Sequence, residues 1–258
     1  MEQFFFLDHG NLNIPCRLSA PDFGEVRRVI LCVHGIGGSS EDTIQAGIAE
    51  EMLLFHAGTL RFDFPAHGKS PLDSTYFTLK NCVTSLLADA QYAKEQFPET
   101  EDLCIFATGF GAYVTLIALE QLQEMPGKVK LVIQTPSVLM HETLLSMLRI
   151  SRETLRLMDA CTLPASRPLD ISYSFYKELE DHIVLTSHIV PMLILHGEKD
   201  DYIPMEHIQN FHRINENSKL VVIPGASHRF REDGAWDMVL DLTRDWFEFE
   251  QVLLSDWR

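Results

Sequence analysis

The sequence predicts an α/β fold with a mostly parallel central sheet. Apolar runs rich in Val, Ile and Leu recur along the chain, at 26–33, 57–62, 103–107, 129–134, 192–195 and 219–223. Such runs are typical of strands that are buried on both faces of a parallel sheet. Most of them alternate with stretches that have apolar residues at helical spacing, which predicts helices on both sides of the sheet. At 258 residues and 46% hydrophobic residues, the chain is large enough for such a core.

The individual elements follow from the same patterns. In chain order we expect strands at 3–7 and 12–18 joined by a turn at 8–11, a strand at 26–33, a helix at 40–55, a strand at 57–62, a helix at 75–97, a strand at 103–107, a helix at 112–122, strands at 129–134, 192–195 and 219–223, and a closing helix at 233–254. We expect Ser39 or Ser40 to cap the helix that begins near residue 40. Trp236, Trp246 and Phe247 are expected on the core face of the closing helix.

The segment 136–190 interrupts this alternation. It contains a helical pattern at 142–158 and an aromatic segment at 173–176. A connection of this length is too long for an ordinary loop between two elements of a sheet. We therefore expect one domain over 1–258, with 136–190 inserted as a helical cap over one end of the sheet. The alternative is a long helical crossover without a functional role.

The composition excludes several classes of partner. The formal net charge of −16 argues against nucleic acid and against an anionic membrane surface, because both select for clusters of Lys and Arg. Solubility is sufficient to explain the acidity, and a preference for uncharged or cationic substrates is the alternative. The five cysteines are scattered and form no CxxC pair, which fits reduced thiols and a cytoplasmic protein. We expect no signal peptide and no membrane helix, since no apolar run approaches about 20 residues.

Polar and glycine-rich segments follow five of the expected strands. They read HGIGG at 34–38, FDFPAHGKS at 62–70, ATGFG at 107–111, HGEKD at 196–200 and GASH at 225–228. Ligands in open α/β sheets bind at the carboxyl ends of the strands. We therefore expect these five segments to converge on one site.

The order and spacing of these segments resemble the α/β-hydrolase superfamily, close to its small serine esterases, thioesterases and aminopeptidase-like hydrolases, over roughly residues 27–250. The resemblance implies that Asp200 is the acid and His228 the base of a catalytic triad. In such a site the acid orients the histidine, which takes the proton of the nucleophile. The resemblance also implies an oxyanion hole made by the backbone N–H groups of Ile36 and Phe110. One departure is Ala66, which stands where the family has glycine.

The nucleophile motif departs from the family where the chemistry needs it. The family places its nucleophile between two small residues on a sharp turn from strand to helix. Ala107 and Gly111 fit the small positions, but Gly109 occupies the nucleophile position and has no side chain. Thr108 is one residue away and is expected to point elsewhere. Glycine avoids most of the strain of this turn, about 1–3 kcal/mol, so Gly109 is compatible with the fold.

Some of these residues have structural alternatives. His228 could be a surface histidine, and Asp200 could cap the helix expected after Pro204, with Asp201 as the neighbour most easily confused with it. Three further histidines are expected to make structural hydrogen bonds in the loops: His34, His67 and His196.

Three functions remain open. The first is a hydrolase of carboxylic esters, thioesters or amides, acting on a small molecule with an apolar portion and impaired because Gly109 is not a nucleophile. The second is a pseudoenzyme that binds a small apolar ligand or a protein partner. The third is an enzyme that uses the His228–Asp200 pair to activate water or abstract a proton without a covalent intermediate. No metal and no cofactor are expected, because HExxH, EF-hand and paired-cysteine motifs are absent from the sequence. The sequence predicts no oligomeric state.

Overall fold

A computed structural model describes residues 2–22 and 25–255 of the chain. Its centre is an eight-stranded sheet in the order β1-β2-β4-β3-β5-β6-β9-β10. The strands are β1 (Glu2–His9), β2 (Leu12–Ser19), β3 (Arg28–Val33), β4 (Ala57–Phe62), β5 (Asp102–Thr108), β6 (Lys128–Gln134), β9 (Met192–Gly197) and β10 (Ser218–Ile223). From β4 to β10 neighbouring strands pair in parallel, whereas β2 is antiparallel to both β1 and β4. The predicted mostly parallel sheet is therefore confirmed.

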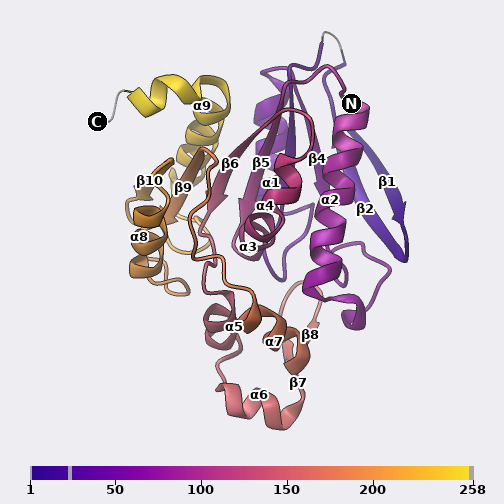
Figure 1. Cartoon of the computed structure of the whole chain (residues 1–258), viewed down its shortest axis with the longest axis vertical. Coiled ribbons are helices and arrows are strands. Elements are labelled where there is room, and N and C mark those ends of the chain that lie inside the picture. The colour runs from indigo at the N-terminus through magenta and orange to yellow at the C-terminus, as the bar shows by residue number, and fades with distance from the viewer. Residues whose placement is uncertain (1, 23–24, 256–258) are drawn as a thin grey trace.

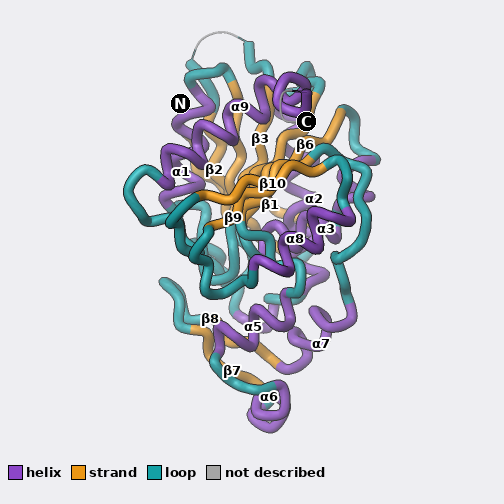
Figure 2. Tube along the Cα trace, turned by 90° about the vertical axis from the view of Figure 1, so that its left-hand side faces the viewer, coloured by secondary structure: helices purple, strands orange, loops and turns teal. Residues whose placement is uncertain are grey.

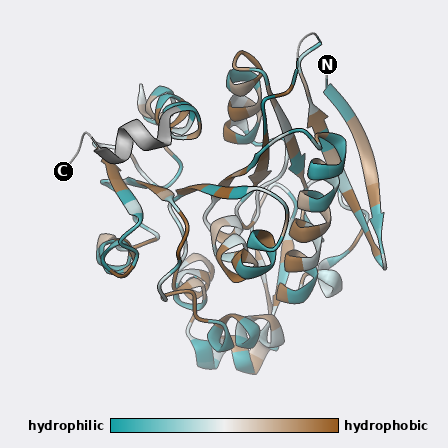
Figure 3. Cartoon of the chain, turned by 45° about the horizontal axis from the view of Figure 1, so that its top comes forward, coloured by the Kyte–Doolittle hydropathy of each residue, from teal (hydrophilic) through white to brown (hydrophobic). Residues whose placement is uncertain are grey.

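Helices cover both faces of this sheet (Figures 1 and 2). They are α1 (Thr43–Leu53), α2 (Leu79–Gln96), α3 (Phe110–Ile117), α4 (Leu119–Gln123), α8 (Met205–Ile214) and α9 (Ala235–Ser255), with a short 3-10 helix η1 (Ser74–Tyr76) before α2. Residues of α1 and α9 share one apolar cluster, and those of α2, α3, α4 and α8 share another. Figure 3 shows apolar residues concentrated on the strands between these helix layers.

Strand β3 shows why the sheet has two cores. Successive side chains of a strand point to opposite faces. Leu31 and Val33 belong to the cluster on the α2 and α3 side, whereas Ile30 and Cys32 belong to the cluster on the α1 and α9 side. All four side chains are buried, as their continuous apolar run predicted. Helix α9 closes the second cluster with Trp246 and Phe247, both fully buried as predicted, while Trp236 is partly buried.

Several helix boundaries differ from the prediction. Helix α1 begins at Thr43 with Asp42 at its N-cap, and no serine side chain caps it. Ser39 and Ser40 are instead held in the preceding loop, where Ser40 N donates to Asp63 Oδ1 at 2.6 Å. The helix predicted at 75–97 is divided into η1 and α2, because extended Thr78 caps α2 by accepting from Asn81 N at 3.2 Å. The helix predicted at 112–122 is divided into α3 and α4 and begins at Phe110.

The segment 136–190 forms a separate group of elements at one end of the molecule (Figures 1 and 2). These are α5 (Met140–Leu148), α6 (Arg152–Met158), β7 (Ala160–Leu163), β8 (Leu169–Ser172) and α7 (Tyr173–Asp181), and β7 pairs with β8 in a two-stranded antiparallel sheet. The single helical pattern expected at 142–158 is two helices. Arg149 has a left-handed backbone with φ of 56°, and Ser151 caps the second helix by accepting from Thr154 N at 3.1 Å.

The cysteines are free, and four of the five are buried: Cys16, Cys32, Cys82 and Cys104. Cys32 and Cys104 lie in β3 and β5, as their apolar surroundings predicted. Across residues 2–22 and 25–255, no helix has the length and apolar character needed to cross a bilayer.

Candidate active site

Asp200 and His228 meet in two neighbouring loops, one after β9 and one after β10. His228 Nδ1 lies 2.9 Å from Asp200 Oδ2. The Asp200 side chain has no exposed surface, whereas that of His228 is 20% exposed. Because Nδ1 is engaged with the carboxylate, Nε2 is the ring nitrogen of His228 that can serve a second partner.

Asp200 is held ionised by its surroundings. Its other oxygen, Oδ1, accepts from Tyr202 N at 2.9 Å and from Ile203 N at 3.0 Å. Burial acts to raise the pKa of Asp200, but the hydrogen bond and charge of His228 and the two backbone N–H groups outweigh it, so the pKa lies below its ordinary value. An ionised carboxylate in this place can stabilise a His228 cation.

The structure excludes the two alternatives for Asp200, namely that Asp201 is the partner of His228 and that Asp200 caps the following helix. Asp201 is exposed, and the carboxylate that reaches His228 belongs to Asp200. Helix α8 has Pro204 at its N-cap, so Asp200 does not cap it. Its bonds to the N–H groups two and three residues ahead form a local turn that fixes the carboxylate.

His34 and His67 connect two of the predicted loops. His34 Nε2 accepts from Phe64 N at 3.1 Å, and His67 Nε2 accepts from Gly37 N at 2.9 Å. Burial lowers the pKa of His67 to about 3, with a further contribution from His34, so its ring is neutral. Both histidines are therefore structural hydrogen-bonding residues, as expected.

His196 does not make the structural hydrogen bond expected of it. Neither ring nitrogen has a hydrogen-bond partner among the described residues, and Nδ1 lies 3.8 Å from Asp200 Oδ2. Burial lowers its pKa against the opposing charge of Asp200. The expectation is wrong for this residue: the nearby carboxylate oxygen, Asp200 Oδ2, lies beyond hydrogen-bond distance of its ring and is engaged by His228 Nδ1.

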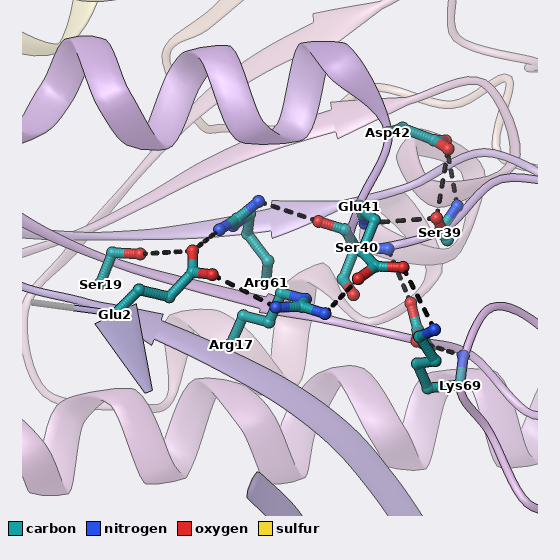
Figure 4. Close-up of polar contacts among 10 residues, drawn as sticks. Glu2, Arg17, Ser19, Ser39, Ser40, Glu41, Asp42, Arg61 and Lys69 are labelled. Atoms are coloured by element: carbon teal, nitrogen blue, oxygen red, sulfur yellow. Dashed lines mark hydrogen bonds and ion pairs between the residues drawn. The ribbon is translucent and has the colours of Figure 1, made fainter. Parts of the chain in front are cut away.

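A polar network holds the loop after β3 from its outer side (Figure 4). Arg61, whose side chain is 5% exposed, donates to Ser40 O at 3.0 Å and forms an ion pair with Glu2. Arg17 pairs with Glu2 at 3.2 Å and with Glu41. This network fixes the loop that carries Ile36 against β1, β2 and β4.

Gly109 is the single residue that connects β5, which ends at Thr108, to α3, which begins at Phe110. Its φ is 49° and its ψ is −111°, a conformation that favours glycine. A Cβ built on Gly109 would meet only Ser137 Oγ, at 3.9 Å. At Gly111 a Cβ would instead lie 2.5 Å from His34 O, so this small position is required by the approach of β3 to α3.

A cavity of about 660 Å³ joins these elements. Four of the predicted site residues line it: Ile36, Gly109, Phe110 and His228. Asp200 is not a lining residue and contacts the cavity only through its hydrogen bond to His228. The segment 136–190 contributes one wall, formed by Thr143, Met147, Leu163, Pro164, Ala165 and Ser166.

Other lining residues were not foreseen from the sequence. They include Thr135 and Ser137 after β6, Arg229 and Arg231 after His228, and Trp236 at the start of α9. The rule that located the five motifs, polar residues at the carboxyl end of a strand, applies equally to the loop after β6. That loop carries no family motif, so the sequence gives no sign that its residues line the cavity.

The sequence matches no protein-family model and no curated protein. The structure, however, is similar to several solved structures. It is similar to Est1E from Butyrivibrio proteoclasticus with ferulic acid bound, at 23% identity and a TM-score of 0.83, over 96% of this chain and 99% of that one. A putative hydrolase from Agrobacterium vitis S4 matches at 17% identity and a TM-score of 0.78, again over 96% and 99%. Mouse alpha/beta hydrolase domain-containing protein 10 matches at 17% identity and a TM-score of 0.77, over 97% and 99%. The chain therefore has the α/β-hydrolase fold, as its motifs predicted.

Proposed function

We propose that this chain is a carboxylic-ester hydrolase by lineage, with a site that keeps its acid, its base and its oxyanion donors and lacks the nucleophile side chain. One observation carries the proposal: the 2.9 Å contact between Asp200 and His228 beside a cavity that also contains Gly109, Ile36 and Phe110. The similar Est1E structure holds ferulic acid, a small aromatic carboxylic acid, which supports a ligand of this class.

In this proposal each site residue acts on a defined part of an ester. The carbonyl oxygen accepts hydrogen bonds from the N–H groups of Ile36 and Phe110, where negative charge develops during attack. His228 transfers the proton, and Asp200 stabilises the resulting cation. Thioesters and amides place the same demands on the site.

The segment 136–190 acts as a cap in this proposal. Met147, Leu163 and Pro164 line the cavity and supply apolar surface for the acyl or alcohol portion of the ligand. The predicted small substrate with an apolar portion fits this wall.

Gly109 limits the chemistry. It offers no atom for an acyl intermediate, and loss of the nucleophile in a triad enzyme costs about 10⁶ in turnover. Oxyanion donors and binding alone retain about 10³–10⁴ over the reaction in water. We therefore infer that turnover is strongly impaired compared with that of a serine enzyme of the same architecture.

Water activation by His228 is the second candidate function. It is favoured by the space beside Gly109, where a Cβ would meet one atom within 4 Å. Attack by water needs no covalent intermediate and requires no side chain at position 109.

The test compares hydrolysis of short-chain p-nitrophenyl esters by the chain and by Gly109→Ser. We expect the serine variant to be faster by orders of magnitude, and His228→Ala to abolish the gain. Gly10→Ser is the matched control, because Gly10 also has a positive φ, of 61°, and free space, but lies in the β1–β2 turn. A folded Gly109→Ser variant that is as slow as the parent would contradict hydrolysis and favour a ligand-binding pseudoenzyme.

A further inference from the structure

The hydroxyl of Ser137 lies beside the position where a nucleophile would stand. Its Oγ is 3.9 Å from the place that a Cβ on Gly109 would occupy. Gly109 and its chain neighbours aside, no other described heavy atom lies within 4 Å of that place. The residue is 3% exposed and lines the same cavity as His228.

The backbone fixes Ser137 relative to the turn. Ser137 N donates to Gly109 O at 3.3 Å, and Gly109 N donates to Gln134 O at 3.0 Å. These two bonds attach the end of β6 and the loop after it to the N–H and the C=O of Gly109. The backbone of Ser137, which carries the hydroxyl-bearing side chain, therefore has a defined position relative to the turn.

The loop also contains a strained residue. Thr135 has φ of 43°, a left-handed conformation that is unfavourable for a β-branched side chain. Thr135 N donates to Leu195 O of β9 at 2.8 Å, which holds this conformation in place. Strain of this kind costs about 1–3 kcal/mol and is concentrated at functional sites.

The Ser137 hydroxyl is directed to the cavity. It makes no hydrogen bond to any group in the described part of the chain, and it is not among the side-chain atoms sealed from solvent. Its donor and its acceptor sites are therefore available to what the cavity holds.

We propose that Ser137 positions a water molecule at the place of the missing nucleophile, and that His228 deprotonates this water for attack on a carboxylic ester. The inference rests on the proposed function and specifies its water-activating form. A serine oxygen is one covalent bond from its Cβ, so an oxygen on the Ser137 side of that place comes within hydrogen-bond reach of Ser137 Oγ.

The step is balanced without any further reactant. The water oxygen bonds to the ester carbonyl carbon while its proton passes to His228 Nε2. The N–H groups of Ile36 and Phe110 hold the resulting oxyanion. Its collapse breaks the ester C–O bond, and His228 returns the proton to the departing alkoxide. The products are a carboxylic acid and an alcohol, and Asp200 stays ionised throughout.

Geometry favours water over Ser137 itself as the attacking group. Phe110 directly follows Gly109, so a carbonyl held by its N–H faces position 109. Ser137 Oγ lies 3.9 Å from the place of a Cβ at this position, a separation that suits a hydrogen bond to the attacking oxygen. Ser137 is therefore a positioning residue.

The test is a double-mutant cycle on p-nitrophenyl acetate hydrolysis with the parent, Ser137→Ala, Gly109→Ser and the double variant. In the parent background we expect Ser137→Ala to lower kcat at least about tenfold with KM unchanged. In the Gly109→Ser background we expect a change of about twofold or less, because the new hydroxyl takes the place of the water. Ser137→Thr, which keeps the hydroxyl, is expected to retain activity. Ser174→Ala, on the exposed side of α7, is the control substitution.

Each contrary result has its own meaning. An equal loss from Ser137→Ala in both backgrounds shows a structural role and overturns the proposal. A covalent acyl group on Ser137, detected in the intact parent by mass spectrometry, makes Ser137 the nucleophile and also overturns it. A parent without turnover beside an active Gly109→Ser variant refutes water activation and leaves the hydrolase lineage standing. If the folded Gly109→Ser variant is inactive too, the proposed function fails as well.

Discussion

Gly109→Ala is expected to lower the free energy of unfolding by about 1–3 kcal/mol, the cost of placing an L-residue in a strained conformation. The backbone at Gly109, with φ of 49° and ψ of −111°, is rarely adopted by residues with a Cβ. The new methyl group meets only Ser137 Oγ at 3.9 Å, an ordinary van der Waals contact, so steric overlap adds nothing. In a chain of this size each kcal/mol lowers the melting temperature by about 2–4 °C, which gives a fall of about 2–12 °C.

Two other glycines separate strain from overlap. At Gly111 a Cβ would lie 2.5 Å from His34 O and 2.6 Å from Val33 O, and both are backbone atoms. Gly111→Ala therefore has to displace β3 from α3 and is expected to be more destabilising than Gly109→Ala. Gly10→Ala carries strain without overlap, since φ is 61° and no atom lies within 4 Å. Its cost is expected to fall in the range of about 1–3 kcal/mol that strain alone produces.

The assay is urea unfolding of the parent and the three alanine variants, followed by circular dichroism at one pH. Equal losses for Gly109→Ala and Gly111→Ala would refute the argument, because they would show that position 109 has no room for a side chain. No loss at Gly109 would refute it differently, by showing that the turn is not strained.

Three further predictions concern charged groups. Asp200→Asn in the Gly109→Ser background is expected to lower kcat about 10³–10⁴-fold. Because its pKa is lowered, the Asp200 carboxylate stabilises the fold above about pH 4, and this contribution is lost as pH falls through the lowered pKa. Acid titration of the variant should therefore show a shallower loss of stability than that of the parent. Burial raises the pKa of Asp89 well above its ordinary value. Its contribution to the free energy of unfolding is therefore full below about pH 4 and declines by at most about 1.4 kcal/mol per pH unit as pH rises. Urea unfolding from pH 5 to 8 should show a flatter dependence of stability on pH for Asp89→Asn than for the parent. Arg61→Leu is expected to cost about 1–3 kcal/mol in thermal unfolding because it leaves Ser40 O without its donor, whereas Lys69→Ala, at an exposed 3.8 Å ion pair, should cost less than about 1 kcal/mol.

The sheet was predictable because its strands carry their own signal. A strand buried on both faces, such as Arg28–Val33, needs a continuous apolar run, and that run is visible in the sequence. The short strands Ala160–Leu163 and Leu169–Ser172 are partly exposed and were not foreseen. Their pairing depends on the surrounding helices. The break at Arg149 depends on them too, because this left-handed position is not marked by a glycine in the sequence.

The site was predictable where a motif fixes a residue to the end of a strand. His228 and Asp200 follow β10 and β9, and parallel pairing of these strands brings the two loops together. Ser137 was not predictable in this way. Its place beside Gly109 depends on the backbone bonds between the two loops and on the positive φ of Thr135, and residues before proline ordinarily favour extended backbone.

The hydrogen bond between Asp200 and His228 does not by itself indicate turnover. Asp200 also accepts two backbone N–H bonds that shape the loop before α8, so a structural demand retains this carboxylate whether or not the protein is a catalyst. A buried carboxylate needs such partners in any case, and His228 supplies one of them. No comparable demand explains the Ser137 hydroxyl, which has no protein partner in the described chain and faces the cavity beside Gly109. The energetic coupling between positions 109 and 137 is therefore more diagnostic of function than the geometry of the acid–base pair.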